Sequence, residues 1–333
     1  MKHFKTKILG TGSFLPDKIL TNDDIAKRVD TNHQWIVERT GIHSRRISDP
    51  SKDETPSGMA KIASEKALEA ANLTANDIDL ILFSATIPDH FFPNSACMLQ
   101  DKLGITNLCG ALDINAACTG WMYALPMADA MIKTGLYKHI LVVGSEMTSS
   151  FNNWDDRNTC ILFGDGCGAV ILGRASENED SEIYSTVLSA DSTKKDHLAL
   201  LAGGAFKRIT HDVLEKGEQW VTMNGQEVYK SAVKTMASLS EKVIKDAGKT
   251  MEEVDWFIPH QANLRIIEAV GNRFNFPPEK VIVNVDKYAN TSSATVPIAL
   301  DEAIREGKIK RGDNILLAAF GAGLTAGAVY LKY

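Results

Sequence analysis

Three side chains in this chain of 333 residues, Cys118, His260 and Asn290, have the types and settings that nucleophilic chemistry requires. Cys118 lies in the run L-D-I-N-A-A-C-T-G-W, where an expected strand leads into an expected helix. Unpaired N–H groups at a helix N-terminus favour an anion, and the thiolate is the nucleophilic form of cysteine. Small neighbouring residues leave room for a substrate, so we predict that Cys118 accepts an acyl group. An inert buried cysteine is the alternative that this stretch alone leaves open.

Two further runs supply groups that could act beside that sulfur. His260 stands in I-P-H-Q-A-N, directly after an expected strand, and parallel α/β folds place their chemistry at strand C-termini. Asn290 stands in Y-A-N-T-S-S-A, where it could cap a helix and also aim its amide at a substrate. The glycine-rich turn F-G-A-G at 320–323 exposes backbone N–H groups, one of which could join the N–H of Cys118 in an oxyanion hole.

The elements that must position these residues follow an alternating pattern of helices and apolar strands. This alternation predicts an α/β fold with a largely parallel sheet. The stretch 191–218 is mixed in composition and is expected to be an excursion that could cover a site. Strands are expected at 6–12, 78–84, 111–114, 139–144 and 169–173, and helices at 22–29, 33–40, 55–71, 94–103 and 119–134.

The second half of the chain repeats the first. At a shift of 176, S-E-K at 64–66 meets S-E-K at 240–242, and the helix and strand around it recur. At a shift of 172, Cys118 falls on Asn290. In a third block, F-G-D-G at 163–166 parallels F-G-A-G at 320–323, and a G-A-V run follows each, at 168–170 and 327–329. We therefore expect two similar halves, 1–175 and 176–333, divided at the acidic loop 176–181.

Composition excludes several classes of function. A net charge of −6 argues against general nucleic-acid binding, which usually shows as a basic excess. Five cysteines without a C-x-x-C pair fit neither a disulfide framework nor a zinc site, so no metal is expected. The G-T-G at 10–12 lacks the third glycine of a dinucleotide fingerprint, so no bound cofactor is expected. Without an apolar leader or membrane-length run, the prediction is a cytoplasmic protein with no membrane partner.

Taken together, A-A-C-T-G-W, P-H-Q-A-N, N-T-S-S-A and F-G-A-G, in this order and spacing, resemble the thiolase-like condensing enzymes, above all the beta-ketoacyl-ACP synthase III family. W-I-V-E-R-T-G-I at 35–42 and F-G-D-G at 163–166 add to the resemblance, which covers essentially the whole chain. It implies a five-layered α/β/α/β/α sandwich of two duplicated halves. It also implies a decarboxylating Claisen condensation of acyl-CoA with malonyl-ACP, performed by a triad of Cys118, His260 and Asn290.

The resemblance implies roles for further residues. Trp35 and Arg157 would sandwich the adenine of coenzyme A, with Thr31, Arg39 and Asn263 along the same path. Backbone N–H groups of Cys118 and Ala322 would form the oxyanion hole. The remaining implied contacts belong to protein partners: Phe92 would enter the acyl pocket of the other subunit of a homodimer, and acyl carrier protein would meet Lys230, Lys234 and Arg265.

Three alternatives stay open at this stage. A specialised synthase of secondary metabolism, using malonyl-CoA or another acceptor, would share the same triad. A papain-like protease also uses Cys, His and Asn, but it expects its cysteine near the N-terminus in a different local run. A non-catalytic scaffold would leave three convergent polar groups unexplained. Ala322, Gln226 and Ala326 depart from residues common in the family, which leaves the acyl primer open.

Overall fold

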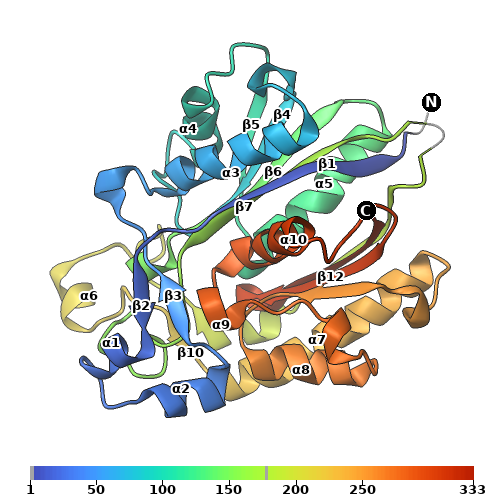
Figure 1. Ribbon diagram of the computed structural model, residues 1–333. Coiled ribbons are helices and arrows are strands. Elements are labelled where there is room, and N and C mark those ends of the chain that lie inside the picture. The colour runs from blue at the N-terminus through green and yellow to red at the C-terminus, as the bar shows by residue number, and fades with distance from the viewer. Residues whose placement is uncertain (1–3, 177–178) are drawn as a thin grey trace.

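The computed structural model describes residues 4–176 and 179–333, which form two stacked β-sheets with helices outside and between them (Figure 1). The first sheet has the strand order β1-β7-β6-β4-β5. Strand β4 pairs in parallel with β5 and β6, whereas β7 pairs antiparallel with β6 and β1. The five strands are β1 (Thr6–Phe14), β4 (Leu80–Ser84), β5 (Gly110–Ile114), β6 (His139–Glu146) and β7 (Gly166–Arg174).

The second sheet has the same pairing pattern in the order β11-β12-β13-β8. Strand β11 is parallel to β12, and β13 is antiparallel to both β12 and β8. A parallel bridge between Phe257 and Val281 occupies the position that β5 has in the first sheet. The strands are β8 (Glu182–Ala190), β11 (Trp256–Pro259), β12 (Asn314–Gly321) and β13 (Thr325–Lys332).

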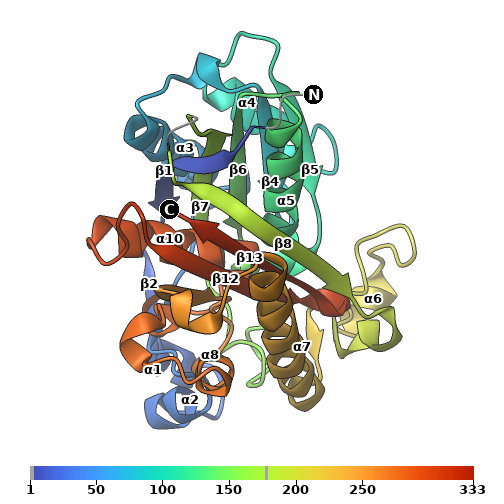
Figure 2. The ribbon, with the colours of Figure 1, turned by 90° about the vertical axis from the view of Figure 1, so that its right-hand side faces the viewer.

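Helices complete five layers, α/β/α/β/α, which confirms the expected architecture (Figure 2). The first sheet is covered on its outer face by α3 (Pro56–Ala71) and α4 (Ser95–Lys102), and the second by α7 (Gly225–Asp246) and α8 (Leu264–Arg273). Between the sheets lie α5 (Gly120–Lys133) and α10 (Thr295–Arg305). Smaller elements are α1 (Asn22–Ala26), α2 (His33–Thr40), α6 (His211–Glu215), α9 (Val285–Tyr288), β2 (Ile19–Thr21), β3 (Ser44–Arg46), β9 (Leu198–Ala199) and β10 (Thr222–Met223).

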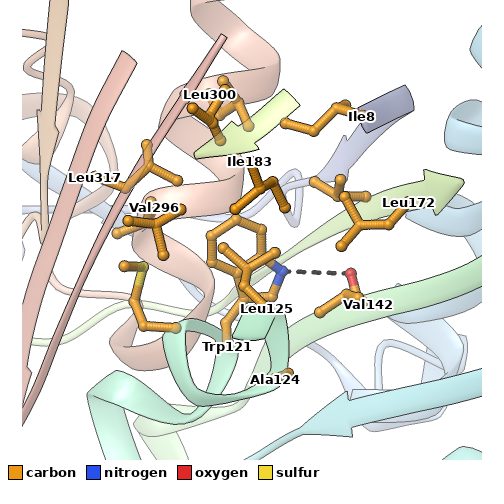
Figure 3. Close-up of a cluster of buried hydrophobic side chains, with 14 of the residues drawn as sticks. Ile8, Trp121, Ala124, Leu125, Val142, Leu172, Ile183, Val296, Leu300 and Leu317 are labelled. Carbon is orange, nitrogen blue, oxygen red and sulfur yellow. Dashed lines mark hydrogen bonds between the residues drawn. The ribbon is translucent and has the colours of Figure 1, made fainter. Parts of the chain in front are cut away.

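The middle layer makes the two halves share one core. Trp121, at the start of α5, is fully buried, and its Nε1–H donates to the carbonyl of Val142 at 3.3 Å. Figure 3 shows it among side chains of both halves, including Leu172 from the first sheet and Leu317 from the second. Burying apolar surface from both sheets against the same helices stabilises the halves as a single body.

The repeat is confirmed at the shift of 176. Helices α3 and α7 end at corresponding positive-φ residues, Asn72 (φ 53°) and Gly248 (φ 68°). Thr74 and Thr250 then form matching capping boxes before β4 and β11. On this alignment His260 corresponds to Ser84, at the end of the first half's equivalent strand.

The expected pairing of Cys118 with Asn290 is wrong. The short 3₁₀ turns before α5 and α10, η3 (Ala117–Thr119) and η8 (Ser292–Ala294), match at a shift of 175, and both begin at a left-handed residue (φ 46° and 50°). Cys118 therefore corresponds to Ser293. The shift of 172 holds only at the helix C-termini, because α10 has 11 residues and α5 has 14.

The expected helices and strands lie within three residues of their predicted bounds. The proposed division at 176–181 includes residues 177 and 178, which lie outside the described residues, and β8 begins at Glu182. Across 4–176 and 179–333, none of the helices combines the length and the apolar character that crossing a bilayer requires.

We predict that Gly144→Ala destabilises the protein by about 1–3 kcal/mol, because a Cβ on β6 would lie 2.8 Å from the carbonyl oxygen of Ser293 on η8. Urea denaturation followed by circular dichroism measures the change. Gly204→Ala is the matched control, since nothing lies within 4 Å of its added Cβ. Equal midpoints for the two variants would contradict a close contact between β6 and η8.

Candidate active site

The sulfur of Cys118 lies at the junction between β5 and α5. Cys118 is in η3 and is only 8% exposed. The Ser292 hydroxyl, from η8 of the other half, lies 3.5 Å from its Sγ and can donate to it. A Cβ at Gly321 would lie 3.1 Å from the backbone nitrogen of Cys118, so glycine lets the end of β12 approach this junction closely. The nucleophile is thus enclosed by elements of both halves.

His260 directly follows β11 and is 3% exposed. Its backbone N–H donates to Ala318 at 2.8 Å, and its Nδ1 lies 2.6 Å from the Thr295 hydroxyl. Burial lowers the pKa of His260 to about 3, so the ring is neutral at physiological pH. The Thr295 hydroxyl can donate its one hydrogen to Nδ1 or to the Ser292 carbonyl, which lies 3.0 Å away. When it donates to Nδ1, the shorter contact, the ring proton is on Nε2, which is then a hydrogen-bond donor.

Asn290 is held by the backbone of the first half. Its N–H donates to Leu162 at 3.0 Å, and its carbonyl accepts from Gly164 at 3.1 Å. Its side-chain Oδ1 accepts from the Ser292 N–H at 2.8 Å. This contact assigns the accepting end of the amide to Oδ1, so Nδ2 is its donating end.

The structure brings these three side chains to one cavity of about 280 Å³. Apolar residues form most of its wall, and Asn263 and Arg265 also line it. A second cavity, of about 80 Å³, adjoins Cys118. Leu198, from the predicted excursion at 191–218, lines both cavities, and Leu200 lines the smaller one. The excursion therefore covers the site, as the sequence suggested.

The expected thiolate is not the resting form of Cys118. Burial raises the pKa of its thiol to about 11, and the hydrogen bond from Ser292 offsets only part of this effect. The Glu146 carboxylate raises the thiol pKa further by repulsion. The prediction of a lowered pKa from the helix N-terminus is therefore wrong, because desolvation of the anion outweighs the attraction of the helix N–H groups.

Glu146, the last residue of β6, is a residue of the site that the sequence motifs did not predict. It is fully buried, and its carboxylate accepts from the backbone N–H and hydroxyl of Thr86 at 2.9 and 3.1 Å. Ser293 also donates to it, through its hydroxyl at 2.6 Å and its N–H at 3.3 Å. An acidic residue ending the apolar run H-I-L-V-V-G-S-E was the available signal, since buried charges are rare.

Of the five residues expected along coenzyme A, only Asn263 lines the cavity. Its Nδ2 donates to the carbonyl of Arg39 at 3.0 Å, which links the cavity to α2. On α2, the Trp35 ring lies beneath two guanidinium groups, 4.0 Å from that of Arg39 and 4.3 Å from that of Arg157. Thr31 lies just before this helix, and its hydroxyl is buried.

The other predicted site residues lie at the smaller cavity or on the surface. Ala322 begins the turn after β12 and lines the smaller cavity with Cys118. Lys230 and Lys234 are exposed on α7, and the exposed Arg265 lies near the start of α8. Phe92 is 87% exposed and lines neither cavity of this subunit.

No group of three or more potential metal ligands gathers anywhere in the part of the chain that the structure describes. The site instead offers a sulfur, an imidazole, an amide and backbone N–H groups around an apolar cavity. This set suits acyl transfer, in which a nucleophile forms a covalent intermediate and fixed donors stabilise developing negative charge.

We predict that alkylation of Cys118 by iodoacetamide keeps accelerating as the pH rises above 9, because burial raises its thiol pKa to about 11. Peptide mapping by mass spectrometry measures the rate at each cysteine, and the exposed Cys97 is an internal reference. A rate at Cys118 that levels off below pH 8 would show that the thiolate is already the resting form.

Comparisons with known proteins show which family the chain resembles. Residues 112–192 match the family model described as 3-oxoacyl-[acyl-carrier-protein (ACP)] synthase III, and residues 244–333 match the model of its C-terminal part. A beta-ketoacyl-[acyl-carrier-protein] synthase III of Caldanaerobacter subterraneus subsp. tengcongensis is 48% identical, over 98% of this chain and 97% of the relative. A beta-ketoacyl-[acyl-carrier-protein] synthase III of Xanthomonas euvesicatoria is also 48% identical, over 100% of this chain and 99% of the relative.

The fold comparison gives the same result. The crystal structure of 3-oxoacyl-[acyl-carrier-protein] synthase III from Aquifex aeolicus matches with a TM-score of 0.89 and 44% identity, covering 98% of this chain and 100% of that one. The sequence and fold comparisons agree over nearly the whole chain. The chain belongs to the beta-ketoacyl-[acyl-carrier-protein] synthase III family of thiolase-like condensing enzymes.

Proposed function

We propose that the chain performs the initiating condensation of fatty acid biosynthesis, joining an acyl-CoA primer to malonyl-ACP to give a 3-oxoacyl-ACP. The observation that carries this proposal is the convergence of Cys118, His260 and Asn290 on one cavity. The full-length relatives share the synthase III name, so the alternative of a specialised synthase of secondary metabolism is not favoured.

In the first half-reaction Cys118 attacks the thioester carbonyl of acyl-CoA. The carbon–sulfur bond to coenzyme A breaks, and an acyl-Cys118 thioester remains. The carbonyl oxygen carries negative charge in the transition state, and backbone N–H groups of Cys118 and Ala322 would hold it. The position of Ala322 beside Cys118 on the smaller cavity supports this role.

In the second half-reaction malonyl-ACP loses carbon dioxide, and its thioester oxygen becomes an enolate. His260, through Nε2–H, and Asn290, through Nδ2–H, would donate to that oxygen as charge develops. The low pKa of His260 keeps the ring neutral, so it donates without becoming an acid that would protonate and quench the enolate. The nucleophilic carbon then attacks the acyl-Cys118 thioester and releases the sulfur.

The nucleotide of coenzyme A would bind outside the cavity, at α2. The guanidinium of Arg157 already stacks on Trp35, and Arg157 also donates to the carbonyl of Asp30 at 2.9 Å. An adenine ring could insert between these two side chains and keep a cationic cover. Thr31, Arg39 and Asn263 would line the path from there to the cavity.

Two protein partners are proposed on the same basis. Exposed Lys230 and Lys234 on α7, with Arg265 on α8, form a basic group near the cavity that suits an acidic carrier protein. A homodimer would cover the edge strand β5, where Leu112 is 42% exposed, together with the exposed Phe92. An uncovered edge strand with apolar side chains favours pairing with another chain.

The smaller cavity supports a short acyl primer. It measures about 80 Å³, and its apolar wall includes Phe151, Leu200 and Val221. Leu200 also lines a neighbouring cavity that contains Phe92. Leu200 and Thr86 line both cavities, so we infer that Leu200 forms part of the wall between the space beside Cys118 and a larger space that a longer chain would need.

We predict that Cys118→Ala abolishes acyl transfer from radiolabelled acetyl-CoA to the protein, because the thioester cannot form without the sulfur. His260→Ala should still be acylated but should lose decarboxylation of malonyl-ACP by about 10²-fold or more, since it removes one donor to the enolate. Label on the Cys118 variant, or normal condensation by the His260 variant, would refute the corresponding role.

We predict that Leu200→Ala shifts primer use towards longer acyl chains, because it would join the two cavities that Leu200 lines. Intact-mass measurement of acylated protein, with acetyl-, butyryl-, hexanoyl- and octanoyl-CoA, gives the chain-length profile. Leu201→Ala is the control, because Leu201 is adjacent in sequence but 51% exposed. The same profile for both variants would show that Leu200 does not limit the primer.

A further inference from the structure

A buried acidic residue beside the nucleophile has no part in the reaction described so far. Glu146 is fully buried, as are the hydroxyl-bearing Ser292 and Ser293 next to it, which are 2% and 1% exposed. Burying a carboxylate is unfavourable unless several donors compensate for lost water. A carboxylate in this position, so close to a sulfur that must lose a proton, therefore requires an explanation.

The acylation step leaves the thiol proton without an acceptor. Cys118 rests as a thiol because burial raises its pKa to about 11, and it must be deprotonated to attack acyl-CoA. His260 is a weak base here, because burial lowers its pKa to about 3, and its Nδ1 is engaged by Thr295. Burial raises the pKa of Glu146 to about 7, which makes it the stronger base of the two.

A continuous chain of hydroxyl groups joins the sulfur to this carboxylate. Sγ of Cys118 lies 3.5 Å from the Ser292 hydroxyl, which lies 3.3 Å from the Thr86 hydroxyl, which lies 3.1 Å from Oε1 of Glu146. The chain crosses between the halves, since Thr86 follows β4 and Ser292 is in η8.

The carboxylate end of this chain fixes the direction of the first hydrogen bond. An ionised carboxylate only accepts, so the Thr86 hydroxyl donates to Glu146. The Ser292 hydroxyl has one hydrogen, which it can donate either to Sγ of Cys118 or to the Thr86 hydroxyl. When it donates to Thr86, its oxygen accepts from the thiol, and every hydrogen along the path points from Cys118 towards Glu146.

We propose that Glu146 is the proton acceptor for Cys118 during acyl transfer, through the hydroxyls of Ser292 and Thr86. This inference rests on the proposed function, in which Cys118 is the nucleophile. The S–H bond breaks as Ser292 gains that proton, Ser292 passes its own to Thr86, and Thr86 passes its own to Glu146. The thiolate bonds to the acyl carbon, and the departing thiolate of coenzyme A takes a proton back from Glu146 by the same hydroxyls, so the balance closes.

The surroundings of Glu146 contain two other ionisable groups that respond to it. Its carboxylate contributes to the raised pKa values of Cys118 on η3 and of Cys167 on β7. The segment after β4 and the turn η8 bring it hydroxyls and backbone N–H groups, from Thr86, Ser292 and Ser293. If the carboxylate only repelled the thiolate, its removal would speed acylation of Cys118. If it accepts the thiol proton, its removal would slow acylation.

The test is the single-turnover rate of Cys118 acylation by acetyl-CoA, measured by rapid quench and intact mass across the pH range. In the unmodified chain we expect the rate to rise with pH through about 7, as Glu146 loses its proton. Glu146→Gln should be slower by about 10²-fold at about pH 8 and should lose that inflection. A variant that acylates as fast or faster would overturn the proposal, because the carboxylate would then only repel the thiolate.

A second pair of variants tests the path without altering the charge. Thr86→Val removes the hydroxyl and should slow acylation by about the same factor, whereas Thr86→Ser keeps the hydroxyl and should restore most of the rate. Failure of serine to rescue would overturn the proposed path. The control for losing a buried charge is Asp129→Asn. Asp129 is a buried residue of α5 that pairs with Lys133. We expect this variant to be acylated at Cys118 at the normal rate.

These outcomes are distinguishable from failure of the proposed function. If Cys118→Ala is labelled by acetyl-CoA like the unmodified chain, Cys118 is not the nucleophile and the proposed function itself fails. If Cys118→Ala is unlabelled while Glu146→Gln and Thr86→Val acylate at the normal rate, only the role of Glu146 is refuted.

Discussion

The close meeting of two strand-to-helix junctions, η3 and η8, is the constraint on which the site depends. Each turn begins at a left-handed residue, Ala117 in one half and Ser292 in the other, and each leads into a helix of the middle layer. A left-handed alanine or serine is strained and persists only where its surroundings over-determine it. Here the surroundings are the other half, so the geometry at Cys118 exists only when both sheets are packed on the shared core.

That packing excludes water, and exclusion of water sets the chemistry. Burial raises the pKa of the Cys118 thiol and of the Glu146 carboxyl group, and it lowers the pKa of the His260 imidazole. Each of these groups is therefore biased towards its neutral form. The same low-polarity surroundings strengthen the hydrogen bonds that act on developing charge. A neutral resting site is therefore compatible with strong stabilisation of the enolate, provided that the thiol proton has an acceptor.

The duplicated halves differ in residue type at the positions where the chemistry lies. Structural correspondence places Cys118 opposite Ser293, and His260 opposite Ser84. Serine therefore stands where the nucleophile and the histidine stand in the other half. Ser293 now donates to Glu146, so a position equivalent to the nucleophile supports the carboxylate beside it. One ancestral junction thus supplies a reacting group in one half and a hydrogen-bond donor in the other.

The elements, the duplication and the motifs around Cys118, His260 and Asn290 could be predicted from the sequence, because periodicity, glycines and capping residues act over short distances along the chain. The alignment of Cys118 with Asn290 was wrong, because α10 is three residues shorter than α5 and this difference leaves no local signal at the junction. The ionisation of Cys118 and the place of Glu146 follow from tertiary packing. Desolvation and hydrogen bonds from Thr86 and Ser293 depend on segments far apart in sequence, and no local pattern records how deeply they bury one another.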